Sequence, residues 1–250
     1  MIEFYSWEEV VIFSNEGGEP MMLIKMGEIV ARELWRNKVI QVNVKNPWTL
    51  VSGKKSPIYI DCRRVISFPY LRDLFVTAAR QIIDIMGLLK EPDCRACSVC
   101  GVGRPVDVIA GGETAGIPFA AFLAQSLNLP MVYVRKEPKG HGSLNLIEGN
   151  LPEGSNVLLV EDLITDGGSK LVFTQGIERA GSRAAGVLVL FDRQQGGKER
   201  LTQEQIPLFS VTDMVIALGS AGGSVLPDEL EEVGRYLDDP DAWESRYSGS

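Results

Sequence analysis

Two adjacent carboxylates and a glycine-rich turn mark the stretch where chemistry is expected. Glu161 and Asp162 follow the unbroken apolar run 157–160, which is typical of a strand buried on both faces of a parallel sheet. The turn 165–169, Thr-Asp-Gly-Gly-Ser, comes next and leads into an amphipathic segment. Glycines let backbone N–H groups approach an anion, and a helix N-terminus favours negative charge. We therefore expect a phosphate at 165–169. The two acids repel phosphate, so sugar hydroxyls or a metal are their expected partners.

A second turn of the same kind begins at residue 111. The run 106–110 predicts a buried strand, Gly-Gly-Glu-Thr-Ala-Gly follows at 111–116, and a helix is expected over 117–127. The N–H groups of this turn offer a place for a second anion. The same turn also occurs as a close-packing feature of doubly wound folds, so both interpretations stay open.

The most basic stretch of the chain follows a predicted strand over 131–134. It reads Arg-Lys-Glu-Pro-Lys-Gly-His-Gly over 135–142, and its proline and glycines predict a loop. Its basic residues are Arg135, Lys136, Lys139 and His141. A basic loop at a strand end suits an anionic leaving group, because it can close, exclude water and neutralise developing charge. The alternative is a solvated charged loop.

Two further stretches carry candidate binding groups. Residues 49–63 combine turn signals with an alternating strand over 58–60, and propensity predicts a basic β-hairpin there. Arg193 follows the apolar run 186–191, within Asp-Arg-Gln-Gln-Gly-Gly. A guanidinium fork pairs well with carboxylate or imide oxygens, so Arg193 is a candidate for a planar anionic ligand. A surface ion pair is the alternative.

Strands that alternate with helices from residue 106 onward must position these groups. The alternation predicts an α/β fold, a parallel sheet flanked by helices with right-handed crossovers. The remaining predicted elements are helices over 23–35, 71–89, 212–218 and 228–237 and a strand over 208–211. We expect a loose N-terminal extension at 1–21, a single domain over 22–237 and a loose tail at 238–250.

Composition limits the partners. The chain has 250 residues, a formal net charge of −8 and 45% hydrophobic residues, which is ordinary for a globular protein with a sizeable core. The negative charge argues against a nucleic-acid or anionic-membrane surface. No apolar run approaches the ~20 residues of a membrane span, and the N-terminus lacks the features of a secretory signal. A cytoplasmic location is therefore expected.

Three of the four cysteines, Cys94, Cys97 and Cys100, have a spacing that can bind zinc or an iron–sulfur cluster. Either group normally needs a fourth ligand, and Cys62 and His141 are the remaining cysteine and histidine. Both lie in other motifs, so free thiols in a reduced compartment are the preferred interpretation.

Taken together, these stretches resemble the orotate phosphoribosyltransferases, which are type I phosphoribosyltransferases. The similar stretches are SGKKSPIYID at 52–61, RKEPKGHG at 135–142, the acid pair and glycine turn at 156–169, and DRQQGG at 192–197. They follow the family order, which makes the set more specific than any one motif. The resemblance implies the type I phosphoribosyltransferase fold, with a small hood formed by residues 22–65 and 205–237 over the ligand-binding edge.

The resemblance also implies a reaction, the transfer of 5-phosphoribose from 5-phosphoribosyl 1-diphosphate (PRPP) to orotate. It implies Mg²⁺ held through substrate oxygens, with no direct protein ligand, and a homodimer with shared active sites. The residues implied to be catalytic are Lys136, Lys139, His141 and Asp162. Those implied to bind PRPP are Arg135, Lys136, Lys139, His141, Glu161, Asp162, Thr165, Asp166, Gly167, Gly168, Ser169, Thr114 and Ala115. Those implied to bind orotate are Tyr59, Ile60, Thr165 and Arg193.

Three positions depart from the family pattern. Val51 stands where a lysine is usual, Asp166 where a small residue is usual, and Gln195 where a glutamate is usual. Lys54 or Lys55 is a candidate to replace the missing lysine. Transfer to another base is therefore one alternative, and a regulatory PRPP-binding protein without catalysis is another. The retained basic loop favours an enzyme.

Overall fold

The computed structural model describes residues 21–50, 53–89, 105–138 and 146–248. Its centre is a six-stranded sheet with the order β10-β9-β8-β5-β6-β7. The strands are β5 (Val108–Gly112), β6 (Met131–Val134), β7 (Ile147–Glu148), β8 (Asn156–Ile164), β9 (Arg183–Asp192) and β10 (Leu208–Asp213). All neighbouring pairs are parallel except β6 and β7, so the predicted parallel sheet carries one short antiparallel strand at its edge.

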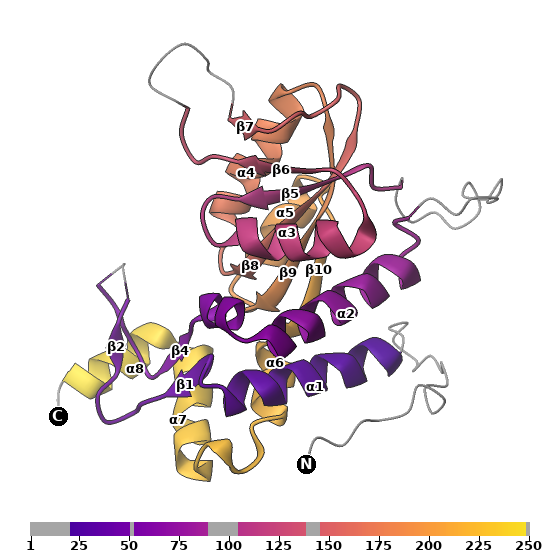
Figure 1. The fold of residues 1–250 in the computed structure, drawn as a ribbon. Helices are drawn as coiled ribbons and strands as arrows, with labels where there is room; N and C mark the ends of the chain where they lie inside the picture. The colour runs from indigo at the N-terminus through magenta and orange to yellow at the C-terminus, as the bar shows by residue number, and fades with distance from the viewer. Residues whose placement is uncertain (1–20, 51–52, 90–104, 139–145, 249–250) are drawn as a thin grey trace.

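Helices cover both faces of this sheet (Figure 1). Those on one face are α1 (Met21–Arg36), α2 (Pro69–Ile85) and α3 (Gly116–Leu127), and those on the other are α4 (Gly168–Arg179) and α5 (Gly197–Gln203). Side chains of β8 alternate between the two cores, as a strand requires. Leu158 and Val160 share a core with Phe119 of α3, whereas Val157 and Leu159 share the other core with Phe173 of α4.

The carboxyl ends of the parallel strands meet at one edge of the sheet, where ligands of open α/β sheets bind. Gly112 at the end of β5 lies opposite Val134 at the end of β6. Ile164 at the end of β8 lies opposite Asp192 at the end of β9. The two glycine turns, the start of the basic loop and Arg193 therefore all emerge at this edge.

Segments from both ends of the chain pack together beside this edge (Figure 1), and we refer to them as the hood. α1 and β10, which the predicted hood of 22–65 and 205–237 includes, belong to the layers of the central sheet instead. From the N-terminal side come β1 (Ile40–Val42), β2 (Trp48–Thr49), β3 (Lys55–Ser56), β4 (Ile58–Ile60) and the 3₁₀ helix η2 (Cys62–Ser67). From the C-terminal side come α6 (Met214–Gly219), the 3₁₀ turn η3 (Gly222–Ser224), α7 (Pro227–Asp238) and α8 (Pro240–Ser248). β1 pairs with β4, and β2 with β3, both antiparallel, so the predicted hairpin is confirmed.

The expectation of a loose tail over 238–250 is wrong for residues 240–248, which form α8. Trp243 is 3% exposed and packs edge-on against Tyr236 of α7, with ring centroids 5.5 Å apart. The Trp243 indole also donates a hydrogen bond to Glu232 at 3.0 Å. Burial of one large aromatic side chain therefore fixes a short segment that has no apolar periodicity of its own.

The described residues show no helix that is both long and apolar enough to cross a bilayer. The predicted N-terminal extension and the three clustered cysteines lie outside the described residues, as do Val51, Lys139 and His141.

Candidate functional site

The adjacent acids Glu161 and Asp162 lie inside β8 and not after its end, so their side chains point to opposite faces of the sheet. Glu161 points toward α4. Its Oε2 lies 2.7 Å from the Nζ of Lys170, and the two side chains are only 5% and 8% exposed. This is a buried ion pair, which is far more sensitive to loss of one partner than a surface pair.

The second oxygen of Glu161 is held against the glycine turn after β5. A Cβ atom at Gly112 or at Gly116 would overlap Oε1, so both positions require glycine for this arrangement. Oε1 makes no well-formed hydrogen bond with the described residues, although the Gly112 N–H lies close enough to favour its charge. Burial raises the pKa of the Glu161 carboxyl, and Lys170 opposes that rise. Glu161 therefore packs behind the glycine turn and is paired with Lys170. Its predicted contact with the ribose hydroxyls stays a prediction.

Asp162 points to the opposite face, toward η2 of the hood. Cys62 and Arg63 of η2 are both within its electrostatic reach. Burial raises the pKa of the Asp162 carboxyl, with Lys170 and nearby backbone N–H groups opposing the shift. Asp162 forms no ion pair with any described residue. Of the two acids, it is the one left available for ligand hydroxyls.

The predicted phosphate turn packs directly onto the start of α5. Gly167 adopts a left-handed conformation (φ 77°) at the N-cap of α4. A Cβ at Gly167 would lie 3.2 Å from the carbonyl oxygen of Gly197, and a Cβ at Gly197 would lie 2.7 Å from that of Thr165. The glycines of the Asp-Arg-Gln-Gln-Gly-Gly stretch thus allow a backbone-to-backbone contact that supports the phosphate turn.

Asp166, which stands where the family usually has a small residue, has its charge paired in the structure. Its side chain is 73% exposed and forms an ion pair with Arg200 of α5, with Oδ2 and Nη1 2.9 Å apart. The carboxylate therefore turns toward α5 and keeps only a long contact of 3.4 Å with the Gly168 N–H. The backbone N–H groups of the turn remain the expected phosphate ligands.

The turn 113–116 is tied to the start of the basic loop. The Glu113 N–H donates to the Val134 carbonyl at 2.8 Å, and the Lys136 N–H donates to Glu113 Oε2 at 2.9 Å. These bonds bring Thr114 and Ala115 beside the basic stretch, as a shared pyrophosphate site requires.

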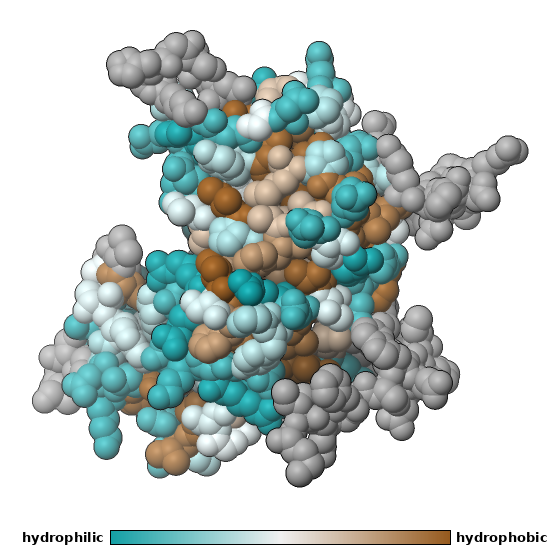
Figure 2. All heavy atoms as spheres, in the orientation of Figure 1, coloured by the Kyte–Doolittle hydropathy of each residue, from teal (hydrophilic) through white to brown (hydrophobic). Residues whose placement is uncertain are grey.

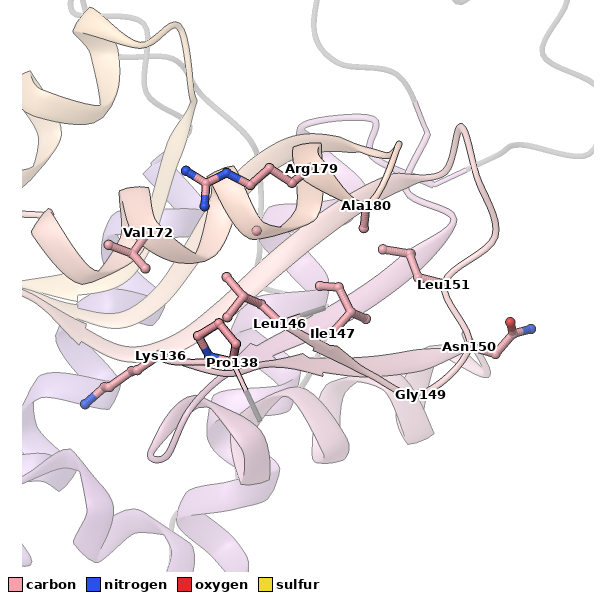
Figure 3. A pocket seen from close by; sticks show the side chains of 11 residues that line it. Lys136, Pro138, Leu146, Ile147, Gly149, Asn150, Leu151, Val172, Arg179 and Ala180 are labelled. Atoms are coloured by element: carbon pink, nitrogen blue, oxygen red, sulfur yellow. The ribbon is translucent and has the colours of Figure 1, made fainter. Parts of the chain in front are cut away.

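The basic residues of this stretch do not all face the site. Arg135 turns toward β7, where its Nη1 lies 3.6 Å from Glu148 Oε1 and its Nε donates to the Glu137 carbonyl at 3.1 Å. Lys136 is exposed and borders a cavity of about 850 Å³ between α4 and β7 (Figure 3). That cavity is lined mainly by apolar residues such as Leu146 and Val172, and it lies apart from Glu161 and Asp162.

On the hood side, the predicted base-binding residues are divided by strand alternation. Tyr59 stacks on Trp48 with ring centroids 5.6 Å apart, and its hydroxyl accepts a hydrogen bond from Arg63 at 3.3 Å. Ile60 points the other way into the core and is 7% exposed. Any contact of Ile60 with a ligand must therefore come from its backbone.

Arg193 follows β9, and its backbone N–H donates to the Ile164 carbonyl at 3.0 Å. Its Nε is buried and has no hydrogen-bond partner among the described residues. Burial lowers the pKa of the guanidinium, while Tyr236 and Cys62 oppose the shift. A desolvated cation without a partner is unfavourable, and an anionic ligand would relieve that cost.

Lysines of the hairpin are already engaged. Lys54 Nζ lies 2.6 Å from Asp241 of α8, and Lys55 Nζ donates to Thr49 at 2.8 Å. Val51 lies outside the described residues, so the replacement of its lysine by Lys54 or Lys55 stays a prediction. Lys170 and Arg200 stand outside every motif of the sequence, so their pairing with Glu161 and Asp166 could not be predicted. The available signal was that each acid, being close to a phosphate turn, needs a cation to neutralise it.

Two glycine turns and an available acid lie at one edge of the sheet, which is the arrangement that a phosphoribosyltransferase needs. Residues 100–210 match the phosphoribosyl transferase domain family. The chain is 41% identical over 226 residues to the orotate phosphoribosyltransferase of Rhizobium etli, over 90% of this chain and 93% of that protein. It belongs to the orotate phosphoribosyltransferase family.

Solved structures of the same family are similar. The orotate phosphoribosyltransferase of Aeropyrum pernix is 29% identical with a TM-score of 0.60, and the match covers 78% of this chain and 98% of that one. The Mycobacterium tuberculosis enzyme in complex with PRPP is 25% identical with a TM-score of 0.57, over 77% of this chain and 98% of that one.

Proposed function

We propose that this chain transfers 5-phosphoribose from PRPP to orotate, which yields orotidine 5′-phosphate and pyrophosphate in pyrimidine biosynthesis. The observation that carries the proposal is a pair of charged groups on the hood side of the sheet edge, neither of which forms an ion pair with a described residue. Asp162 and Arg193 are both electrostatic neighbours of the buried Cys62, yet neither forms an ion pair with a described residue. One suits the hydroxyls of a sugar and the other the carboxylate of a base.

The remaining groups divide the ligand between them. The turn 165–169 would receive the 5-phosphate through backbone N–H groups and the N-terminus of α4. The turn 113–116, supported by Glu161 and Lys170, would receive pyrophosphate oxygens. In an oxocarbenium-like transition state the ribose gains positive charge, and Asp162 would stabilise that charge while it holds the ribose hydroxyls.

Mg²⁺ fits this site as a substrate-bound ion. Mg²⁺ commonly keeps several waters and binds through substrate oxygens, so Asp162 would contribute by holding the ribose and would not be a direct ligand. When bound, the ion would neutralise charge on the pyrophosphate oxygens.

We further propose a cytoplasmic location. We also propose a homodimer in which Lys139 and His141 act on the pyrophosphate in the neighbouring subunit's site. The support for a second subunit is α3, whose sequence GIPFAAFLAQSL is apolar almost all round. Figure 2 shows apolar residues gathered over this helix on the exposed face of the molecule. An apolar face of this kind suits a partner surface.

The test is turnover with a panel of bases. Purified protein with PRPP and Mg²⁺ is assayed for pyrophosphate release in the presence of orotate, uracil, adenine or hypoxanthine. We expect rapid pyrophosphate release with orotate and not with the other three bases. Faster release with another base would support the alternative that Val51 and Gln195 prompt. PRPP binding without turnover of any base would support the regulatory alternative.

A further inference from the structure

Asp166 places a negative charge in the turn that is expected to hold a phosphate, and the structure shows how this charge is managed. Its carboxylate pairs with Arg200 at 2.9 Å, and the same guanidinium nitrogen approaches the Asp166 carbonyl oxygen at 3.4 Å. The two side chains are 73% and 47% exposed, so the pair contributes little to folding. Any effect of the pair on ligand binding must therefore come from its position at the phosphate turn.

The pair lies against Gly168, whose N–H is one of the expected phosphate ligands. This N–H donates to Asp166 Oδ1 at 3.4 Å, which is too long for a strong bond. A Cβ at Gly168 would lie 3.2 Å from both Asp166 Oδ2 and Arg200 Nη1. The carboxylate and the guanidinium therefore lie together beside the Gly168 Cα, at the exposed side of the turn.

Arg200 is held there by the backbone. The start of α5 packs on the turn through the contacts of Gly167 and Gly197, and the Arg200 N–H donates to the Gly196 carbonyl at 3.1 Å in the first turn of α5. The guanidinium thus reaches the turn from an element that cannot shift without breaking a close backbone contact.

We infer that Arg200 is a positioning residue for the 5-phosphate of PRPP. It holds the Asp166 carboxylate at the exposed side of the turn and cancels its charge. The carboxylate then keeps only a long contact of 3.4 Å with the Gly168 N–H, which the phosphate can displace. Without Arg200, Asp166 is an uncompensated anion beside a dianion. At a separation of about 5 Å in a near-aqueous dielectric, this repulsion weakens binding on the order of tenfold.

The experiment is a double-mutant cycle of Arg200→Ala and Asp166→Ala in the full chain. Affinity for ribose 5-phosphate is measured by calorimetry, and KM for PRPP and kcat are measured with orotate. Arg200→Ala should weaken ribose 5-phosphate binding and raise KM on the order of tenfold, with kcat changed less than twofold. The double variant should recover to within about twofold of Asp166→Ala, because the repelling charge is gone.

Two further arms separate charge from structure. The loss in Arg200→Ala should shrink at high salt, and Arg200→Lys should retain most of the affinity. Arg36→Ala removes another exposed arginine ion pair, with Glu33 on α1, and should leave both affinities unchanged. Unfolding midpoints show that the variants are folded.

The inference fails if Arg200→Ala costs the same affinity with and without Asp166, since Arg200 would then act directly on the phosphate or through structure. It also fails if Arg200→Ala has no effect. The inference rests on the proposed function for the identity of the ligand. A protein that binds ribose 5-phosphate but does not turn over orotate refutes the proposed function and leaves this cycle decisive.

Discussion

Arg193 offers the sharpest test of base recognition, because its Nε is buried without a partner among the described residues. In Arg193→Ala the carboxylate of orotate loses a charge-assisted hydrogen bond. Such bonds contribute about 1.5–3 kcal/mol, which corresponds to about 10- to 150-fold in affinity. Uracil lacks the carboxylate and should lose much less. The ratio of kcat/KM for orotate to kcat/KM for uracil is therefore expected to fall by about 10- to 150-fold.

The same variant makes a prediction about stability that separates binding from folding. Removal of a largely buried cation whose Nε has no partner among the described residues should leave the free energy of unfolding unchanged or raise it, because its burial is unfavourable. Arg193→Lys keeps the charge without the planar fork and should fall between wild type and Arg193→Ala. Arg183→Ala, at the exposed opposite end of β9, is the matched control and should preserve the ratio.

The assay is steady-state pyrophosphate release with each base at fixed PRPP, combined with urea unfolding of each variant. If Arg193→Ala lowers the orotate and uracil rates by the same factor, Arg193 does not read the carboxylate. If it also lowers the free energy of unfolding, its role is structural. Either result would refute the assignment of the base site.

The remaining predictions concern the acid pair, the glycine turn and the loop. Burial raises the pKa of Asp162 above its unfolded value, so its contribution to stability is greatest below the unfolded pKa and is lost as pH rises through the folded pKa. Asp162→Asn should therefore unfold at higher urea than wild type at pH 7, with this gain vanishing at acid pH, and should turn over PRPP more slowly. Gly112→Ala should cost about 1–3 kcal/mol in urea unfolding because its Cβ would overlap the Glu161 carboxylate, whereas Gly219→Ala, with open space around it, should cost much less. Mixing inactive Lys139→Ala and Asp162→Asn proteins should restore partial activity if the loop acts across a dimer interface, and no recovery after confirmed subunit exchange would place the loop in its own subunit's site.

Much of the fold could be predicted because its strands are encoded by unbroken apolar runs. Strand β6 was predicted with its observed ends, and the run 157–160 forms the middle of β8. The predicted position of the acids was less accurate. Apolar patterning ends at Val160, but the strand continues to Ile164 because β9 continues to pair with it. The alternation of side chains therefore extends through Glu161 and Asp162 and sends them to different faces.

What could not be predicted depends on contacts between distant elements. Helix α8 is short and lacks apolar periodicity, and Trp243 is buried against residues of α7 that include Tyr236 and Glu232. Strand alternation alone predicts that the side chains of Tyr59 and Ile60 point to opposite faces of β4, but the resemblance implied that both contact the base. The partners of Lys54 and Lys55 depend on how the hairpin meets α8, which local sequence does not specify.

The arrangement of charges explains how an acidic chain can present three carboxylates at a site for anionic ligands. Lys170 neutralises Glu161 in the interior, and Arg200 neutralises Asp166 at the surface. Neither carboxylate then repels a phosphate. Asp162 is left without an ion pair among the described residues, and Arg193 is left without a partner for its Nε. These two groups carry an electrostatic cost in the free protein, and both lie near Cys62 beneath the hood. A ligand that combines ribose hydroxyls with an anionic base relieves both costs at once, so the same unpaired charges that lower stability select the substrates.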